Sequence, residues 1–156
     1  MNKGKLFLVI GGAVVLLGLF IAPQLNDPNR VLKKAWAEVD VGCLPSQGQV
    51  AQHMHPVLAV TLDGQRVPIP ANIGILRGCI AEIHTHDNSG TLHIEPLITS
   101  KNFTLKDFFK VWGESFEKEG YTMEVTVDGQ PSPELGNLIL RDGQQIILNY
   151  INAQGI

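Results

Sequence analysis

The chain has 156 residues, a formal net charge of −3 and an apolar fraction of 44%. It contains no stripe of lysine and arginine residues, which argues against a nucleic-acid partner. Its composition is also not that of an intrinsically disordered chain, which would be poorer in apolar residues. This length allows one folded domain together with additional segments.

An uncharged apolar run, Leu6–Ala22, stands near the N-terminus. As a helix it would extend about 26 Å, which is close to the lower limit for crossing a bilayer core. Lys3 and Lys5 precede it, as in a signal sequence or a signal anchor. Pro23 directly after the run disfavours cleavage, so we predict a retained membrane anchor over residues 1–24 rather than a cleaved peptide.

Lysine and arginine residues flank the apolar run on both sides, so charge bias alone does not decide its orientation. Long domains after a first apolar segment are often translocated regardless of nearby charge. We therefore expect a single-pass membrane protein whose soluble domain is extracytoplasmic and whose partners are the membrane and a membrane protein. Residues 25–40 are predicted to form a juxtamembrane spacer containing a short helix that begins at Pro28.

Residues 41–156 are predicted to form one soluble domain. In chain order, we expect a hairpin turning at Asp63-Gly64, a connection over 71–78, a second hairpin around 87–90, a helix over 104–120, a strand leading to Asp128-Gly129, and final strands around Asp142-Gly143. This order resembles that of a β-grasp (ubiquitin-like) domain with a second hairpin inserted before the helix. The expected fold class is α+β, with one mixed sheet packed on one helix.

The expected helix has clear start and stop signals. Thr104 followed by Asp107 resembles a capping box, and Gly120 is a suitable end. Large apolar residues recur at helical spacing and predict a face packed on the core. These residues are Leu105, Phe108, Phe109, Trp112 and Phe116.

Two cysteines, Cys43 and Cys79, lie in the predicted soluble domain. In an oxidising compartment they are expected to pair as a disulfide. Two alternatives stay open, namely that one or both are metal ligands or that they are unpaired buried thiols.

All five histidines of the chain fall in two short stretches. One is "HMH", with His53 and His55, and the other is "AEIHTHDNSGTLHIEP", with His84, His86 and His93. Because side chains alternate along a strand, His84 and His86 share one face. An even-length hairpin loop then places His84 directly opposite His93 and Glu82 opposite Glu95.

Three imidazoles on rigid strands form a suitable set of donors for zinc, copper, nickel or iron. We therefore predict a divalent transition-metal site at His84, His86 and His93, with His53 and His55 contributing. Glu82, Glu95 and Asp87 are candidates for orienting these ligands. A hydrogen-bonded polar cluster or a pH-sensitive interface is the alternative.

The stretches "HMHPVLAVTLDGQRVPIPANIGI", "GCIAEIHTHDNSGTLHIE" and "FTLKDFFKVWG" resemble an uncharacterised family of small membrane-anchored proteins of archaea and bacteria. The motif HTHDxSGxLHxE carries this resemblance most specifically. It implies a shared domain and does not imply a mechanism.

The leading hypothesis is a metal-binding protein at the outer face of a membrane that stores, transfers or presents a metal. Copper is the first candidate for this metal and zinc the second. Met54, a soft donor, favours copper. The alternative is a zinc-dependent hydrolase or hydratase in which Glu82, Glu95 or Asp87 acts as the base. A third hypothesis is a non-catalytic interaction domain that offers a sheet edge to a partner.

Overall fold

The computed structural model describes residues 28–45 and 49–153. The predicted anchor, Leu6–Ala22, lies outside these residues. Within the described ranges, no helix is both long and apolar enough to cross a membrane. The chain divides into two compact units, Met1–Lys34 and Ala35–Ile156, and apart from the start of helix α2 the features described below belong to the second.

Helix α2 (Pro28–Glu38) begins at the proline that the sequence predicted. Its last residues belong to the compact second unit, where Trp36 is fully buried and its indole Nε1 donates a hydrogen bond to the carbonyl of Val111 at 3.2 Å. The segment predicted as a spacer therefore contributes a core residue to the folded unit.

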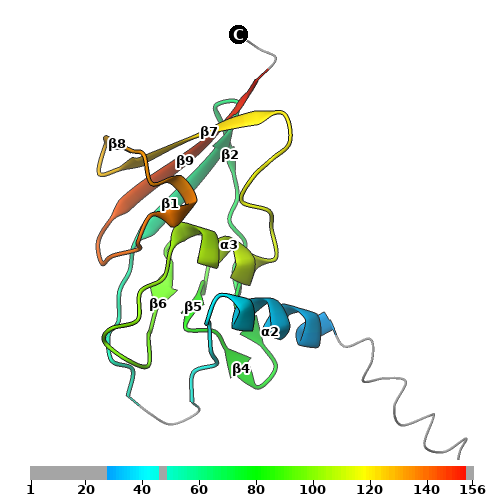
Figure 1. The fold of residues 1–156 in the computed structure, drawn as a ribbon, viewed down its shortest axis with the longest axis vertical. Helices are drawn as coiled ribbons and strands as arrows, with labels where there is room; N and C mark the ends of the chain where they lie inside the picture. The colour runs from blue at the N-terminus through cyan, green and yellow to red at the C-terminus, as the bar shows by residue number, and fades with distance from the viewer. Residues whose placement is uncertain (1–27, 46–48, 154–156) are drawn as a thin grey trace, which may run out of the picture. The chain divides into compact units, whose positions relative to one another are not determined.

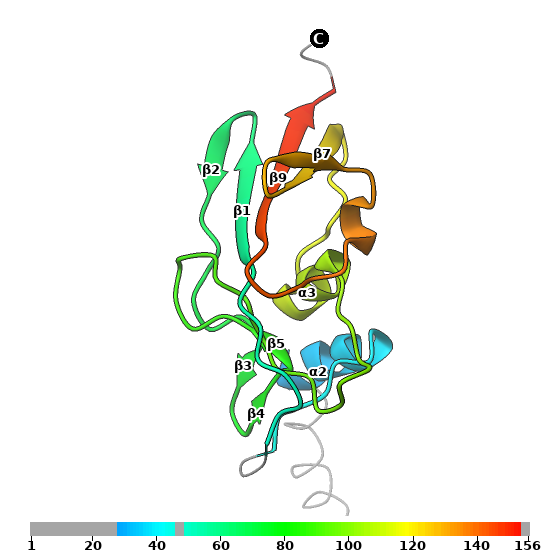
Figure 2. The same ribbon diagram turned by 90° about the vertical axis from the view of Figure 1, so that its left-hand side faces the viewer.

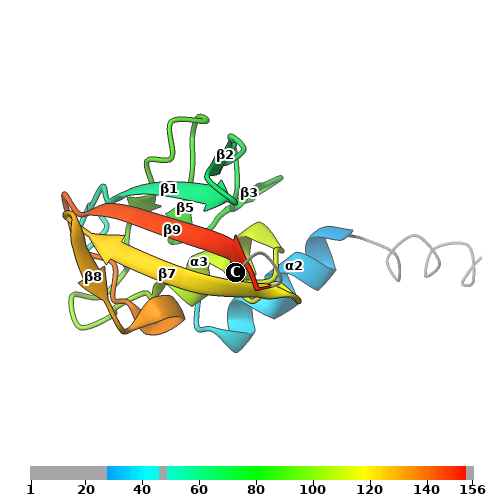
Figure 3. The same cartoon turned by 90° about the horizontal axis from the view of Figure 1, so that it is seen from above.

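A five-stranded mixed sheet forms one layer of the second unit (Figure 3). Its strand order is β2-β1-β9-β7-β8, in which β1 and β9 are parallel and the other neighbours are antiparallel. The strands are β1 (Val57–Leu62), β2 (Gln65–Val67), β7 (Tyr121–Val127), β8 (Gln130–Ser132) and β9 (Gln145–Asn152). The predicted α+β class with a mixed sheet is confirmed.

Helix α3 (Leu105–Trp112) covers one face of this sheet (Figures 1 and 3). Strand β9 alternates exposed and buried residues, as expected for a strand with one face toward a core. Ile146, Leu148 and Tyr150 from β9 are at most 1% exposed, and Phe108 of α3 is fully buried. The apolar stripe predicted for the helix therefore forms the core between helix and sheet.

Helix α3 starts as predicted but ends earlier than predicted. The Thr104–Asp107 capping box is present in both directions. The helix stops at Trp112 rather than near Gly120, because Gly113 adopts a left-handed conformation with φ 83° and its N–H donates to the carbonyls of Phe109 and Lys110. A 3₁₀ helix, η1 (Leu135–Asn137), stands between β8 and β9.

The segment 68–103 between β2 and α3 forms a second region, which we call the insert (Figure 2). It contains four two-residue strands: β3 (Ile75–Leu76), β4 (Cys79–Ile80), β5 (Ile83–His84) and β6 (His93–Ile94). β3 pairs with β4, whereas β5 pairs with β6. β3 lies in the segment that the sequence predicted as a plain connection.

One long strand was expected from Cys79 to His86, and this expectation was wrong. The strand is divided because residues 80–82 turn to pair with the segment before β1, where Ala81 bridges Cys43 and the N–H of Glu82 donates to the carbonyl of Gly42. The loop that follows β5 is fixed against β1 by Gly90, whose carbonyl accepts from Leu58 N at 2.9 Å. Gly90 has φ 90°, and a Cβ there would collide with the carbonyl oxygen of Leu58.

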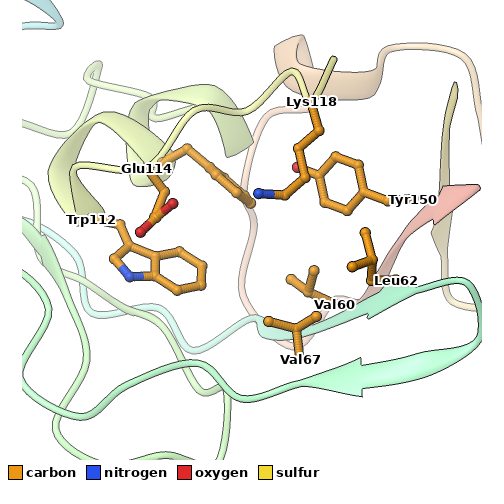
Figure 4. A pocket seen from close by; sticks show the side chains of 8 residues that line it. Val60, Leu62, Val67, Trp112, Glu114, Lys118 and Tyr150 are labelled. Carbon is orange, nitrogen blue, oxygen red and sulfur yellow. The ribbon is translucent and has the colours of Figure 1, made fainter. Parts of the chain in front are cut away.

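A largely apolar cavity of about 210 Å³ lies between the sheet and the segment that follows α3 (Figure 4). Val60, Leu62 and Val67 line it from β1 and β2, while Trp112 and Tyr150 line it from α3 and β9. None of the histidines contributes to its lining. The cavity and the histidines are thus separate features of the domain.

Candidate metal centre

The histidines are organised around strand β6. On one side, β5 pairs with β6 in the register Ile83↔Ile94 and His84↔His93. This is the pairing that an even-length loop requires, and it places the imidazoles of His84 and His93 on the same face. Their ring centroids are 5.4 Å apart and nearly parallel.

The "HMH" segment lies along the other side of β6. Met54 and Ile94 exchange two backbone hydrogen bonds of 3.0 Å, and a second bridge joins Val57 to Thr91. These two bridges keep one register, which places His55 directly opposite His93. β6 therefore lies between β5 and the "HMH" segment, and the chain on each side of it carries an H-x-H pair on the same face.

This arrangement brings all five histidines together. The ring of His93 lies 4.4–5.9 Å from the other four rings, measured between centroids. Two groups of three have ligand nitrogens that all lie within 4.8 Å of one another. We call them the inner triad (His84, His86 and His93) and the outer triad (His53, His55 and His93). Each has the geometry to hold a metal ion.

The inner triad is already close to a ligating geometry. The Nε2 atoms of His84 and His86 are 3.2 Å apart. Two imidazole nitrogens on one tetrahedral ion, each about 2.0–2.1 Å from it, would be separated by about 3.3 Å. The same spacing also suits a hydrogen bond with His86 as the donor when no ion is bound.

A backbone carbonyl fixes the orientation of the His84 ring. Its Nδ1 lies 2.9 Å from the carbonyl of Ala81, so Nδ1 carries the proton and donates it, which leaves the Nε2 lone pair free to ligate. His84 is 1% exposed. Burial lowers its pKa, and the hydrogen bond to Ala81 opposes this only in part. The ring is therefore held in the neutral form that a metal requires.

His93 is the residue shared by both triads. Burial and the nearby histidines lower its pKa to about 4, because a proton on this ring would meet charge on its neighbours. Its Nδ1 is buried and has no hydrogen-bond partner among the described residues. An unsatisfied buried nitrogen is costly, and an ion ligated through Nδ1 would satisfy it.

Carboxylates orient the outer triad. His53 Nε2 lies 2.8 Å from Glu95 Oε1, which matches their directly opposed positions. Asp142 accepts from the backbone N–H of His55 at 2.8 Å, and its Oδ1 is 4.0 Å from His55 Nδ1. The contact with Glu95 holds one nitrogen of the His53 ring and directs the other toward a ligand, whereas Asp142 holds His55 through its backbone.

Glu82 and Asp87 have other principal contacts. The carboxylate of Glu82 is fully buried and accepts from Gly42 N at 2.7 Å, Leu97 N at 3.0 Å and Lys101 Nζ at 2.6 Å. The structure thus gives Glu82 a role in holding the insert and does not direct it at a histidine. Asp87 accepts from Ser89 N at 2.9 Å, and this bond together with the Ser89 side chain lowers the pKa of Asp87.

Cys43 and Cys79 form a disulfide, with Cα atoms 5.1 Å apart and a sequence separation of 36. The bond fixes the segment before β1 to β4, two residues from the Ala81 carbonyl that orients His84. With both sulfurs engaged, no thiolate competes with the imidazoles for a metal among the described residues.

Comparisons of this chain with protein-family models, with curated proteins and with solved structures found no match. The case for its function therefore rests on the geometry of the histidines.

Sequence reasoning missed three groups that support this geometry: Asp142, the carbonyl of Ala81 and the side chain of Lys101. Asp142 had been assigned only to a turn, and it reaches His55 because β9 and β1 are adjacent strands. Lys101 pairs with Glu82, which the sequence had suggested as a residue that orients a metal ligand. The contacts of Asp142 and Lys101 depend on how distant segments pack, so no local sequence pattern marks them. The contact of the Ala81 carbonyl with His84 spans only three residues, and it was missed because the turn over residues 80–82 was not expected.

Proposed function

We propose that this chain is a metal-binding protein that stores, transfers or presents a divalent transition metal through its histidine cluster, at the outer face of a membrane. The observation that carries the proposal is the inner triad. Two of its nitrogens are 3.2 Å apart, one ring is locked with Nε2 free, and the third ring has a buried Nδ1 without a hydrogen-bond partner. A hydrogen-bonded cluster alone would leave this last nitrogen unsatisfied.

Copper is the first candidate and zinc the second. Imidazole donors suit both, and copper binds a given set of nitrogen ligands most tightly among the divalent metals of its series. Met54 does not strengthen the case for copper, because its pairing with Ile94 places it on the face opposite to His93. The preference therefore rests on the imidazoles alone.

The domain itself supports a binding role more than catalysis. The order β2-β1-β9-β7-β8, with a parallel β1–β9 pair and a helix on one face, resembles that expected of a β-grasp domain carrying an insert. Glu82 is committed to Lys101 and Glu95 to His53, so neither is positioned as a general base. The Cys43–Cys79 disulfide suits an oxidising compartment. It therefore supports an extracytoplasmic location for the domain that follows the predicted anchor in the sequence.

The test is calorimetric titration of Cu²⁺ and Zn²⁺ into the full chain and into single variants. We expect tight binding by the wild type and a large loss of affinity in His84→Ala and in His93→Ala. Each removes a ligand of the inner triad, and even a residue that only orients a ligand is worth about 10–100-fold in affinity. Asn88→Ala, an exposed change in the same insert, is the matched control and should bind as the wild type does. Unchanged affinity in both histidine variants would contradict the proposal.

A further inference from the structure

The two triads share one ligand and differ in their access to solvent. The inner triad has one fully buried ligand, His84, which is 1% exposed, although His86 is exposed. The outer triad has no fully buried ligand, since the side chains of His53 and His55 are 51% and 42% exposed. The shared His93 is half-buried and lies on β6, between the two segments that carry the other histidines. An ion in the inner triad is therefore covered by protein on the side of His84, whereas an ion in the outer triad has no fully buried ligand to cover it.

The two pairs of rings are also held differently. His84 is fixed by a neutral backbone carbonyl inside the insert, which leaves little freedom for its ring. At the surface, the carboxylate of Glu95 contacts the ring of His53, and that of Asp142 accepts from the backbone N–H of His55. Those carboxylates place negative charge beside the outer triad, which favours the arrival of a cation from solvent.

We propose that the cluster is a two-position path for a single ion, an inference that rests on the proposed metal-binding function. The outer triad exchanges the ion with solvent or with an acceptor, and the inner triad retains it. His93 stays bound throughout. Movement inward breaks the bonds from the metal to His53 and His55 and forms bonds to His84 and His86, with the charge of the ion unchanged.

Sharing His93 explains why the path holds one ion. Each triad needs His93 to reach three imidazole ligands, because its other two members sit on one flanking segment. A second ion would find only two imidazoles and would face the charge of the first across one ring. The register of β6, with His84 on one side and His55 on the other, makes this sharing a property of the strand pairing.

The experiment compares affinity with exchange rate for Cu²⁺ in the full chain. The variants are the pair His53→Ala/His55→Ala, which leaves the inner triad intact, and the pair His84→Ala/His86→Ala, which leaves the outer triad intact. Binding is measured by titration, and release is measured by stopped-flow transfer of the ion to an excess of a chromogenic chelator. Asn88→Ala serves as the control for the release measurement.

We expect one ion per wild-type chain. His53→Ala/His55→Ala should keep its affinity within about threefold and slow release at least tenfold, because the solvent-facing position is gone. His84→Ala/His86→Ala should lose at least tenfold in affinity and release faster than the wild type, because the retaining position is gone.

Two results would overturn the path while leaving metal binding in place. One is release from His53→Ala/His55→Ala at the wild-type rate, and the other is two ions bound per wild-type chain with similar affinity. A wild-type chain that binds neither Cu²⁺ nor Zn²⁺ would instead contradict the proposed function itself. The failure of the path and the failure of the function are therefore distinguishable.

Discussion

Two regions of the domain are stabilised in different ways: the five-stranded sheet packed on α3, and the insert. Strands β7 and β9 have seven and eight residues and pair along continuous ladders, and the residues between the sheet and α3 are apolar. The insert has strands of two residues each, and its buried groups include a charged carboxylate and a histidine. The core depends on many similar contacts, whereas the insert depends on a few specific links.

That difference has a consequence for the histidines. Short ladders alone would not hold the imidazoles in fixed positions, so the insert needs the Cys43–Cys79 disulfide, the Glu82–Lys101 pair and the contact of Gly90 with β1. We expect single changes at these links to cost more than single polar changes in the sheet region.

The largest effect is expected for Glu82→Ala. This change leaves Lys101, Gly42 N and Leu97 N without their buried acceptor. Removing one partner of a buried pair costs about 3–5 kcal/mol, because the charge of Lys101 then keeps only the exposed carboxylate of Asp40, 3.5 Å away. Urea unfolding measures the loss. Glu117→Ala, which removes the exposed partner of Lys106, is the control and should cost less than about 1 kcal/mol. Equal losses in the two variants would show that the insert is not specially dependent on Glu82.

The second effect concerns the disulfide. Cys43→Ala/Cys79→Ala should lose about 2–4 kcal/mol of stability, because the cross-link closes a loop with a sequence separation of 36. The variant should also bind Cu²⁺ more weakly, since the Ala81 carbonyl that orients His84 lies beside Cys79. Unfolding and titration are run on the same preparation. A stability loss with full affinity would show that the inner triad is positioned without the disulfide.

The third effect is a pH dependence of the metal-free protein. The pKa of His93 is about 4 when folded, against 6.5 for an unperturbed histidine, so the unfolded chain takes up this proton first as the pH falls. Stability should therefore be unaffected by His93 above pH 6.5, fall between pH 6.5 and 4, and level off below that. We expect roughly 1–2 kcal/mol after allowing for solvent screening at this half-buried ring. His93→Gln should flatten the dependence of stability on pH over this range. A variant that keeps the wild-type slope would show that other titratable groups cause the pH dependence.

The smallest effect is expected in the sheet. Tyr150→Phe removes the hydrogen bond that the Tyr150 hydroxyl donates to the carbonyl of Phe116 at 2.6 Å. We expect a loss of about 1 kcal/mol with no change in metal affinity, because the ring still fills its place in the core. A loss as large as that of Glu82→Ala would remove the contrast between the two regions.

Sequence patterns were sufficient for several features whose deciding contacts are local. The Thr104–Asp107 capping box joins neighbours along the chain, and the alternation of His84 and His86 follows from the two-residue period of a strand. The register of His84 with His93 follows from a short loop of even length. The end of α3 was local as well, but two glycines competed for it, and Gly113 stops the helix because it is the first able to adopt the left-handed cap.

Only the tertiary structure decided how the two groups of histidines meet. Nothing in "HMH" indicates that it pairs with β6 in a register that puts His55 opposite His93, because that pairing depends on how the chain before β1 runs past the insert. The pairing of Glu82 was likewise decided by the tertiary structure, because its partner Lys101 lies in another segment of the chain. The period of a strand fixes which side chains share a face, and the packing of distant segments fixes which faces meet.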